Sequence, residues 1–506
     1  MSFELVWLKR DLRWLDHAPL AGASMQGPIR VVYIVEPGLW AQPDVSLQHF
    51  EFIAESLHDL HIELQRQSGA VEVHYGNAVE VFEQIWQEGA FPRIHSHQET
   101  GNSWTYKRDL AVAAWCQSKG VSWQESAQFG VVRGLKDRNR WQRAWEQHMG
   151  APKSSPGPMR FWRSYPSHSL RMVTPAGLAH SAPKRQRGGR GQATLVLQEF
   201  LETRSEQYRG GISSPRLAPN ACSRLSVYLA YGCLSMREVV QASRARLAEL
   251  PAQSRQRLGL QSFLSRLYWH CHFIQKLESE PEIEWQNMHR GYDGLREEDF
   301  NLRHFEALQA GATGWPMVDA CVTMLRETGW LNFRMRAMLV SVASYPLWLH
   351  WRPVGEWLAR QFLDYEPGIH WSQMQMQAGT TGINTTRVYN PIKQAQDHDP
   401  RGDFVRFWLP HLRGVPSTWI FEPWRLPSGA GLKISGRDPR PIPQPVVDLA
   451  AATKLAKQRL YERRNRPDVR AARGAIVERH ASRLGRRDEL RESRAEPDAP
   501  QLSLDL

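Results

Sequence analysis

The sequence predicts an α/β domain built on a doubly wound parallel sheet, followed by an all-helical domain. Two patterns carry this prediction. In the first third of the chain, short runs rich in β-branched and aromatic residues alternate with helical stretches, which is typical of a parallel sheet with helices on both faces. From about Ala193 to residue 380, Trp, Leu and Arg instead interleave in helical stretches. A loop-rich stretch with frequent prolines closes the second domain.

The alternation places five buried strands in the first domain, at 3–8, 30–35, 71–75, 93–97 and 121–125. It places helices at 48–66, 78–87 and 103–117. The turn after the first strand, LKRDLRWLD, contains no glycine and therefore lacks the dinucleotide-binding fingerprint. A nicotinamide-dependent dehydrogenase is disfavoured for this reason.

A basic segment joins the two domains. Residues 151–197 contain no acidic side chain and eight basic ones, namely Lys153, Arg160, Arg163, Arg171, Lys184, Arg185, Arg187 and Arg190. We expect most of this segment to be a solvated connection. A phosphate-contacting role stays open for part of it.

Composition limits the classes of partner and compartment. The 506 residues include 64 Lys plus Arg against 52 Asp plus Glu, a formal net charge of +12, which favours an anionic partner. The five cysteines are odd in number and have no CxxC spacing, so a disulfide framework is not expected and the pattern fits a reducing cytosol. No apolar run approaches the roughly 18 residues of a membrane span. We therefore expect a soluble, cytoplasmic protein. We also expect a monomer.

The segment Gly314–Leu412 combines apolar helical periodicity with charged residues. Arg334, Arg336, Asp364 and Arg387 lie in or beside apolar, Trp-rich stretches. An unpaired charge is costly in such surroundings, and a paired one often marks a ligand site.

This order of blocks resembles the flavin-binding half of the DNA photolyase and cryptochrome superfamily. The resemblance continues through ELVWLKRDLRWLDHAPL, HQETGNSWTYKRDLAV, CSRLSVYLAYGCLSMRE, SRLYWHCHF and PRPIPQPVVDL. It implies an antenna-type α/β domain over 1–135, a basic linker over 136–195, a helical FAD-binding domain over 196–463 and a basic tail over 464–506. Members of the family carry FAD, and a second, antenna chromophore is possible, its identity left open.

The resemblance also assigns the flavin contacts. Ser223 to Ser226 and Tyr208 match the phosphate contacts, where hydroxyls, a cation and helix-terminal amides suit a pyrophosphate. Cys222 stands where the family has a hydroxyl residue. Arg336 and Asp364 match the ion pair beside the isoalloxazine ring, where a cation would stabilise the anionic reduced flavin. The full set of assigned flavin positions is Tyr208, Ser223, Arg224, Leu225, Ser226, His270, Arg336, Asp364, Glu366 and His370.

Several positions depart from the family pattern. His370 falls where photolyases have Asn near flavin N5; it is either a proton donor or acceptor there or a core histidine. The electron-relay tryptophans are changed too, because only Trp351, the middle position, is kept. Met374 and Glu298 occupy the flavin-proximal and outer positions, and methionine is a poor hopping station. A route through Trp330 or Trp371, or chemical reduction, must replace the usual relay.

The residues expected to face the DNA substrate match the family at some positions and differ from it at others. Trp269 matches the aromatic wall that stacks on a flipped thymine dimer, and Arg387 matches the phosphate clamp. Arg266 replaces an acidic residue that contacts the dimer, and Met376 replaces a second aromatic wall. The paired histidines of animal-type (6-4) enzymes are absent from WLNFRMRA. We expect no metal site at residues 270–272, since neighbouring residues on a helix point in different directions.

The tail carries charge and a short motif. Residues 454–494 hold fourteen basic and six acidic side chains, a surplus of 14 − 6 = +8. The chain then ends in Gln501-Leu502-Ser503-Leu504-Asp505-Leu506. This string resembles the hexapeptide with which bacterial repair proteins dock on the sliding clamp, through Gln501, Leu502, Leu504 and Leu506.

The resulting hypothesis is a flavin-dependent photolyase of UV-damaged DNA, with cyclobutane pyrimidine dimers as the expected substrate. Trp269, His370 and Trp351 are its candidate catalytic residues, and Trp269, Arg266, Arg387 and Met376 its candidate DNA contacts. Three alternatives stay open: a cryptochrome-type blue-light photoreceptor, a (6-4) photolyase, and a DNA-binding flavoprotein without repair activity.

Overall fold

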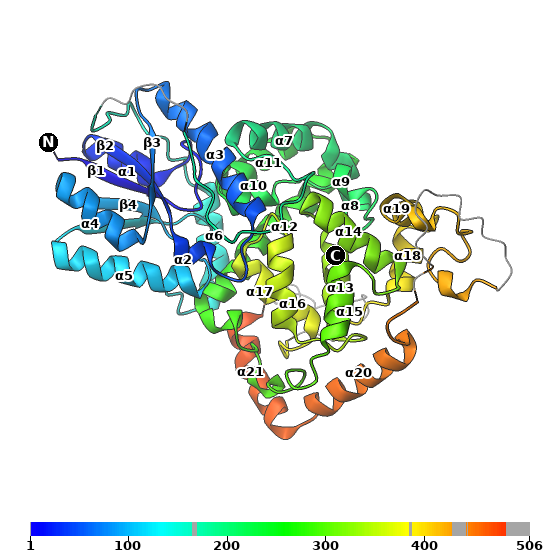
Figure 1. The fold of residues 1–506 in the computed structure, drawn as a ribbon. Helices are drawn as coiled ribbons and strands as arrows, with labels where there is room; N and C mark the ends of the chain where they lie inside the picture. The colour runs from blue at the N-terminus through cyan, green and yellow to red at the C-terminus, as the bar shows by residue number, and fades with distance from the viewer. Residues whose placement is uncertain (1, 164–169, 384–386, 428–441, 443, 482–506) are drawn as a thin grey trace, which may run out of the picture.

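The computed structural model describes residues 2–163, 170–383, 387–427, 442 and 444–481. Its N-terminal part is a five-stranded parallel sheet in the order β3-β2-β1-β4-β5 (Figure 1). The strands are β1 (Glu4–Leu8), β2 (Ile29–Val35), β3 (Val71–Tyr75), β4 (Arg93–His97) and β5 (Ser122–Ser126). The predicted fold class is confirmed, and each predicted strand lies within one residue of its expected bounds.

Alternate side chains of β1 enter two different cores, one on each face of the sheet. Val6 and Leu8 pack with residues of α1 (Ala18–Gln26) and α3 (Leu47–Gln65). Leu5 and Trp7 pack with residues of α4 (Ala78–Glu88) and α5 (Ser103–Lys119). The sheet is thus covered on both faces, as the continuous apolar strand β1 requires. The predicted helices are α3, α4 and α5, while α1 was not predicted.

Helices build the second domain around α12 (Arg255–Ser279), which packs against α17 (Pro367–Ala378). The remaining helices of the chain up to residue 408 are α2 (Pro37–Trp40), α6 (Trp141–Gly150), α7 (Arg190–Glu202), α8 (Tyr208–Gly211), α9 (Ala218–Ala221), α10 (Ser226–Ala230), α11 (Met236–Glu249), α13 (Leu302–Ala310), α14 (Pro316–Thr328), α15 (Phe333–Ser344), α16 (Trp351–Gln361), α18 (Pro391–His398) and α19 (Asp403–Trp408). Short 3-10 turns η1 (Arg138–Arg140), η2 (Arg204–Gln207), η3 (Pro281–Glu284), η4 (Arg290–Tyr292), η5 (Pro410–Leu412) and η6 (Pro423–Arg425) connect them.

The basic segment between the domains is more ordered than a solvated connection. Between residues 151 and 197, α7 begins at Arg190, and arginines of the segment contact acidic residues of both domains. Arg185 is nearly buried and bonds Glu55 at 2.9 Å, while Arg190 bonds Glu238 at 2.6 Å. These pairings occupy two of the cations for which a phosphate contact was considered.

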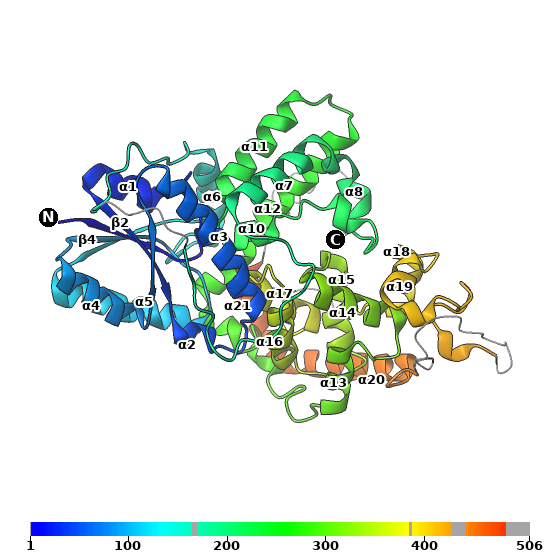
Figure 2. The ribbon, with the colours of Figure 1, turned by 45° about the horizontal axis from the view of Figure 1, so that its top comes forward.

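Two further helices, α20 (Leu449–Arg464) and α21 (Pro467–His480), run along one side of the helical domain (Figures 1 and 2). The end of α21 meets the end of α12, where His480 Nε2 lies 2.7 Å from a carboxylate oxygen of Glu280. Among the residues that the structure describes, no helix has the length and apolar character needed to cross a membrane.

Candidate functional site

A buried ion pair joins α15 to the loop before α17. Arg336 Nη2 lies 2.9 Å from Asp364 Oδ2, and Arg336 Nε donates to the Leu331 carbonyl at 2.8 Å. Burial opposes ionisation of Asp364, but Arg336 and the Ser226 hydroxyl outweigh it and keep the pKa of Asp364 below its ordinary value. The second oxygen, Asp364 Oδ1, is buried and has no hydrogen-bond partner among the described residues. The pair thus holds one unused acceptor.

The segment Ser223–Ser226 contributes a cation, Arg224, that interacts electrostatically with Asp364 but forms no ion pair among the described residues. Arg224 has a positive φ of 61°, which is uncommon for a residue with a side chain. Its guanidinium lies 3.9 Å from the centroid of the Trp330 ring. Burial lowers the pKa of Arg224 to about 10, and no ion pair to a carboxylate is formed by it within the described chain. Leu225 is buried, and Ser226 begins α10. Such a site favours an anion.

Tyr208 and Arg266 lie together beside this segment. Tyr208 begins α8, is 7% exposed and hydrogen-bonds Arg266 through its hydroxyl. Tyr208 also interacts electrostatically with Cys222, which precedes Ser223. Arg266, predicted to face DNA, is therefore grouped with the residues assigned to the flavin phosphates.

Two neutral histidines flank the Arg336–Asp364 pair. Burial lowers the pKa of His270 and of His370 to about 4 in each case. His270 packs on Phe129 with 5.4 Å between ring centroids, and its buried Nδ1 has no partner among the described residues. His370 Nε2 lies 2.9 Å from the Gly355 carbonyl. Because a carbonyl can only accept, Nε2 carries the hydrogen and Nδ1 of His370 is left as an acceptor.

Arg10 is a site residue that sequence reasoning missed. It follows β1 in the N-terminal domain and donates to the Tyr365 carbonyl at 2.7 Å and to the Ala230 carbonyl at 2.9 Å. It also lies 3.4 Å from Glu366. Burial raises the pKa of Glu366 to about 7 despite this cation. Arg10 therefore ties the N-terminal domain to both segments that hold assigned flavin residues.

The residues assigned to DNA do not form one contact group. Trp269 is half-buried on α12, next to His270, with its ring 4.9 Å from His272 and 5.8 Å from Phe273. Met376 is half-buried on α17, whereas Arg387 is exposed beyond the end of that helix. The positions of the four residues are compatible with a broad face, and their roles stay predictions.

Tryptophans form a contact series at α16 and α17. Trp351 and Trp371 are nearly fully buried, and their rings meet edge-to-face at 5.9 Å. Trp371 in turn lies 4.9 Å from the His370 ring. Met374 is buried on the same helix, and Glu298 is exposed.

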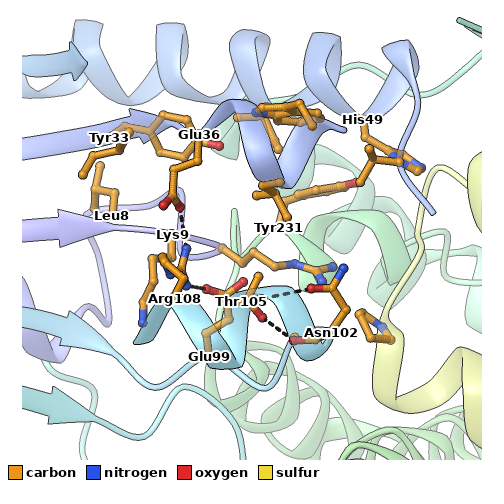
Figure 3. A pocket seen from close by; sticks show the side chains of 18 of the residues that line it. Leu8, Lys9, Tyr33, Glu36, His49, Glu99, Asn102, Thr105, Arg108 and Tyr231 are labelled. Carbon is orange, nitrogen blue, oxygen red and sulfur yellow. Dashed lines mark hydrogen bonds and ion pairs between the residues drawn. The ribbon is translucent and has the colours of Figure 1, made fainter. Parts of the chain in front are cut away.

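A cavity lies at the carboxyl edge of the sheet, between the two domains (Figure 3). Arg108 occupies its floor, bonded to Glu36 at 2.7 Å and to Glu99 at 2.5 Å, with its guanidinium 4.7 Å from the Trp7 ring. Tyr33, Trp40, His49, Asn102, Thr105, Tyr231 and Tyr365 are among the other lining residues. The carboxyl edge of a doubly wound sheet is where ligands of such folds bind.

Asp11, His17 and His97 form a buried triad near the cavity. Asp11 Oδ2 lies 2.9 Å from His17 Nε2 and 2.7 Å from His97 Nδ1. Because the Leu20 N–H donates to His17 Nδ1, the ring hydrogen of neutral His17 is on Nε2, the nitrogen that lies next to Asp11. The separations are those of hydrogen bonds and are shorter than the roughly 3.3 Å between ligand atoms of a tetrahedral zinc site.

The residues Gln501, Leu502, Leu504 and Leu506, predicted to dock on a clamp, lie outside the described residues.

Comparison with known proteins identifies both domains. Residues 4–132 match the family described as DNA photolyase, and residues 263–462 match the FAD binding domain of DNA photolyase. Among relatives, Cryptochrome DASH of Gloeobacter violaceus is 26% identical over 497 residues, covering 91% of this chain and 97% of its own. Deoxyribodipyrimidine photo-lyase of Escherichia coli is 26% identical over 471 residues, covering 88% of this chain and 96% of its own.

Solved structures share the fold. A bacterial class III photolyase from Agrobacterium tumefaciens superposes with a TM-score of 0.78 at 22% identity, over 92% of this chain and 98% of the other. An archaeal photolyase from Sulfolobus tokodaii, solved with two FAD molecules, superposes with a TM-score of 0.72 at 22% identity, over 91% and 100%.

Proposed function

We propose, because the chain belongs to the family of DNA photolyases and cryptochromes, that it is a light-dependent DNA repair enzyme that uses FAD to split pyrimidine dimers. One observation carries the repair role. Trp269, half-buried, directly precedes His270, whose pKa is influenced by Asp364 of the flavin site. A base stacked on Trp269 would therefore lie close to the flavin. A light sensor has no evident use for such an aromatic surface.

The residues fit FAD on physical grounds. Within the part of the chain that the structure describes, Asp364 Oδ1 and His270 Nδ1 are buried polar atoms without hydrogen-bond partners, and Arg224 is a half-buried cation without an ion pair to a carboxylate. Each would be costly if it stayed unsatisfied. A dinucleotide with a polar ring edge and two phosphates offers hydrogen-bonding groups to the first two and an anion to the third. We assign the phosphates to Ser223–Ser226 and Tyr208, and the ring to Arg336, Asp364, His270 and His370.

Reduced FAD, when bound, supplies the electron that opens the dimer after excitation by light. The chain's own residues set the conditions for this step. Arg336 keeps a positive charge beside the ring, where it stabilises the anionic reduced form. His370 is neutral and presents only an acceptor, so it can bind a protonated ring nitrogen but cannot protonate a bare one. Trp269 holds the extruded base by stacking.

A cryptochrome-type photoreceptor is the second candidate, and the altered relay favours it. Met374 and Glu298 interrupt the usual tryptophan series, and His370 replaces an amide. Illumination of an oligonucleotide that carries a cyclobutane dimer, with purified reduced protein, decides between the two. We expect light-dependent recovery of intact pyrimidines. Absence of recovery with fully loaded, reduced protein would favour the photoreceptor, or a DNA-binding flavoprotein if damaged DNA still binds. An oligonucleotide with a (6-4) photoproduct, treated in parallel, tests the (6-4) alternative.

Two further sites belong to this proposal. The cavity around Arg108 (Figure 3) is our site for a second chromophore, since it faces Tyr231 and Tyr365 next to the flavin residues. The hexapeptide Gln501–Leu506 is our docking peptide for a bacterial sliding clamp, which would raise the effective concentration of the enzyme on DNA.

A further inference from the structure

A group of basic side chains lies next to Trp269 and is not used by the proposed flavin site. We call Arg138, His272, Lys276 and His480 the basic cluster. Arg138 comes from η1, His272 and Lys276 from α12, and His480 ends α21. Arg138 Nη2 lies 2.6 Å from His272 Nδ1, and the His272 ring lies 4.9 Å from the Trp269 ring. Three segments distant in sequence thus bring basic side chains to the stripe of α12 that carries Trp269.

Three of the four members of the basic cluster are buried, and Arg138 is half-buried. His272 is 2% exposed, Lys276 8% and His480 1%. The Lys276 ammonium lies 4.9 Å from the centroid of the Phe273 ring, and burial and then Arg138 lower the pKa of Lys276 to about 7. No carboxylate acts on the charge of Lys276, and no ion pair joins it to an acidic residue in the described part of the chain. A buried ammonium in this situation lacks the partner that ordinarily offsets its desolvation.

The carboxylate of Glu280, which follows α12, is engaged by other side chains. Glu280, one turn of α12 beyond Lys276, accepts from His480 Nε2 at 2.7 Å and from Arg479 at 2.9 Å. The other ring nitrogen, His480 Nδ1, is buried and has no hydrogen-bond partner among the described residues. Electrostatic interactions connect Lys276 with both His272 and His480. The cluster therefore offers an ammonium and an imidazole nitrogen to a group that the described residues do not supply.

We propose that the basic cluster binds a phosphate group of the DNA strand whose base lies on Trp269. This inference rests on the proposed function. An oxyanion pairs with the Lys276 ammonium, lies beside the Arg138 guanidinium, and lets His480 protonate and donate through Nδ1. The aromatic faces of Trp269 and Phe273 border the cluster, so the ligand combines an anion with flat, apolar groups. A nucleotide within a strand has this combination.

Lys276→Met provides the test, because it separates binding from stability. Removal of an unpaired buried charge should leave the free protein as stable as the parent or more stable in thermal denaturation. Its affinity for a single-stranded oligonucleotide, damaged or undamaged, should fall about fivefold at 0.1 M salt, the factor for one counterion released from a single strand. The slope of log affinity against log salt should fall by about 0.7. Lys107→Met, at an exposed lysine of α5, makes the same change in net charge and should alter neither quantity.

A second variant and a second ligand complete the design. His480→Gln keeps a donor for Glu280 but removes the free ring nitrogen, and it should weaken oligonucleotide binding in the same direction. Inorganic phosphate, titrated with the parent protein and with Lys276→Met, distinguishes a strand phosphate from a small-anion site. Stabilisation of the parent alone by millimolar phosphate, with equal oligonucleotide affinities, would overturn the strand assignment. Parent-like oligonucleotide binding and salt slope in both variants would overturn the site itself. Dimer repair by the parent, measured in the same preparations, shows whether the proposed function holds independently of this result.

Discussion

Trp371 packs edge-to-face on Trp351, with 5.9 Å between the ring centroids, and its other side meets the His370 ring at 4.9 Å. In the proposed site, this contact links His370 with Trp351 and would replace the aromatic step that Met374 is predicted to remove. Gly355 makes it possible, because a Cβ at that position would lie 2.6 Å from the Trp371 ring. The two indoles are close enough to act as neighbouring stations for an electron.

The first prediction concerns photoreduction. Sequence reasoning left Trp330 and Trp371 as alternative stations, and the structure favours Trp371. The Arg224 cation, 3.9 Å from the Trp330 ring, disfavours loss of an electron from that indole. Trp371→Phe should slow light-driven reduction of bound oxidised FAD more than Trp330→Phe does, as followed by the absorbance near 450 nm. Trp351→Phe should have a smaller effect than in relatives with a complete relay.

One result would contradict electron transfer through Trp371. Complete loss of photoreduction on Trp351→Phe, with Trp371→Phe unchanged, would place the ordinary relay back in the protein and refute the alignment of Met374. Equal FAD content of the three variants is the control.

The second prediction concerns the cofactor. Arg336→Ala leaves Asp364 buried without its cation, and loss of one partner of a buried pair costs about 3–5 kcal/mol. We expect a lower free energy of unfolding, by an amount towards the low end because Arg336 is 23% exposed, and a lower ratio of FAD to protein after purification. Arg401→Ala, which removes an exposed surface pair with Asp403, should change neither. Full FAD occupancy in Arg336→Ala would remove Arg336 from the proposed site.

Much of this site was predictable, and the reason for the rest is physical. Strands such as 30–35 can be predicted from their local content of β-branched and aromatic residues. The Arg336–Asp364 pair can be predicted because both residues stand at matching positions of the family's motifs. Arg10 carried no such signal, because its partner Tyr365 is 355 residues away and the contact is to a backbone carbonyl. The interaction of Arg266 with the Tyr208 hydroxyl was equally hidden, since a residue on α12 can reach either Tyr208 or the solvent and the sequence does not show which.

The third prediction concerns pH. His370 has a folded-state pKa of about 4 against an ordinary 6.5, so the unfolded chain binds the extra proton first as the pH falls. Its contribution to stability is therefore present above pH 6.5 and is lost progressively towards pH 4. Between pH 7 and pH 5, one such histidine accounts for about 2 kcal/mol. The free energy of unfolding should fall between pH 7 and pH 5 in both proteins, and the fall should be about 2 kcal/mol smaller in His370→Asn than in the parent. Urea denaturation at both pH values measures the difference. An identical pH dependence in parent and variant would show that His370 is not buried as a neutral ring.

The fourth prediction concerns the DNA face. If Trp269 stacks on the extruded dimer, Trp269→Ala should weaken binding to damaged DNA by about 1–3 kcal/mol and leave undamaged DNA little affected. Arg387→Ala should weaken both DNAs alike and reduce the salt dependence, because an exposed arginine contacts phosphates without reading the lesion. Equal losses from both substitutions on both DNAs would mean that the face is assigned wrongly.

The fifth prediction concerns the hexapeptide Gln501–Leu506. A glutamine followed by leucines at alternate positions can fill an apolar pocket, and three leucines in a basic, Pro-containing segment have no other evident use. The peptide also discriminates between functions, because attachment to a clamp raises the effective concentration of a repair enzyme on DNA and gives a light sensor nothing comparable. Titration of bacterial sliding clamp with the full chain should show saturable binding, and a version that ends at Pro500 should show none. A variant with Gln501, Leu504 and Leu506 replaced by alanine controls for chain length and should behave like the shortened version. Negligible binding by the full chain, or equal binding by all three proteins, would remove the peptide from the proposal while leaving the flavin and DNA sites untouched.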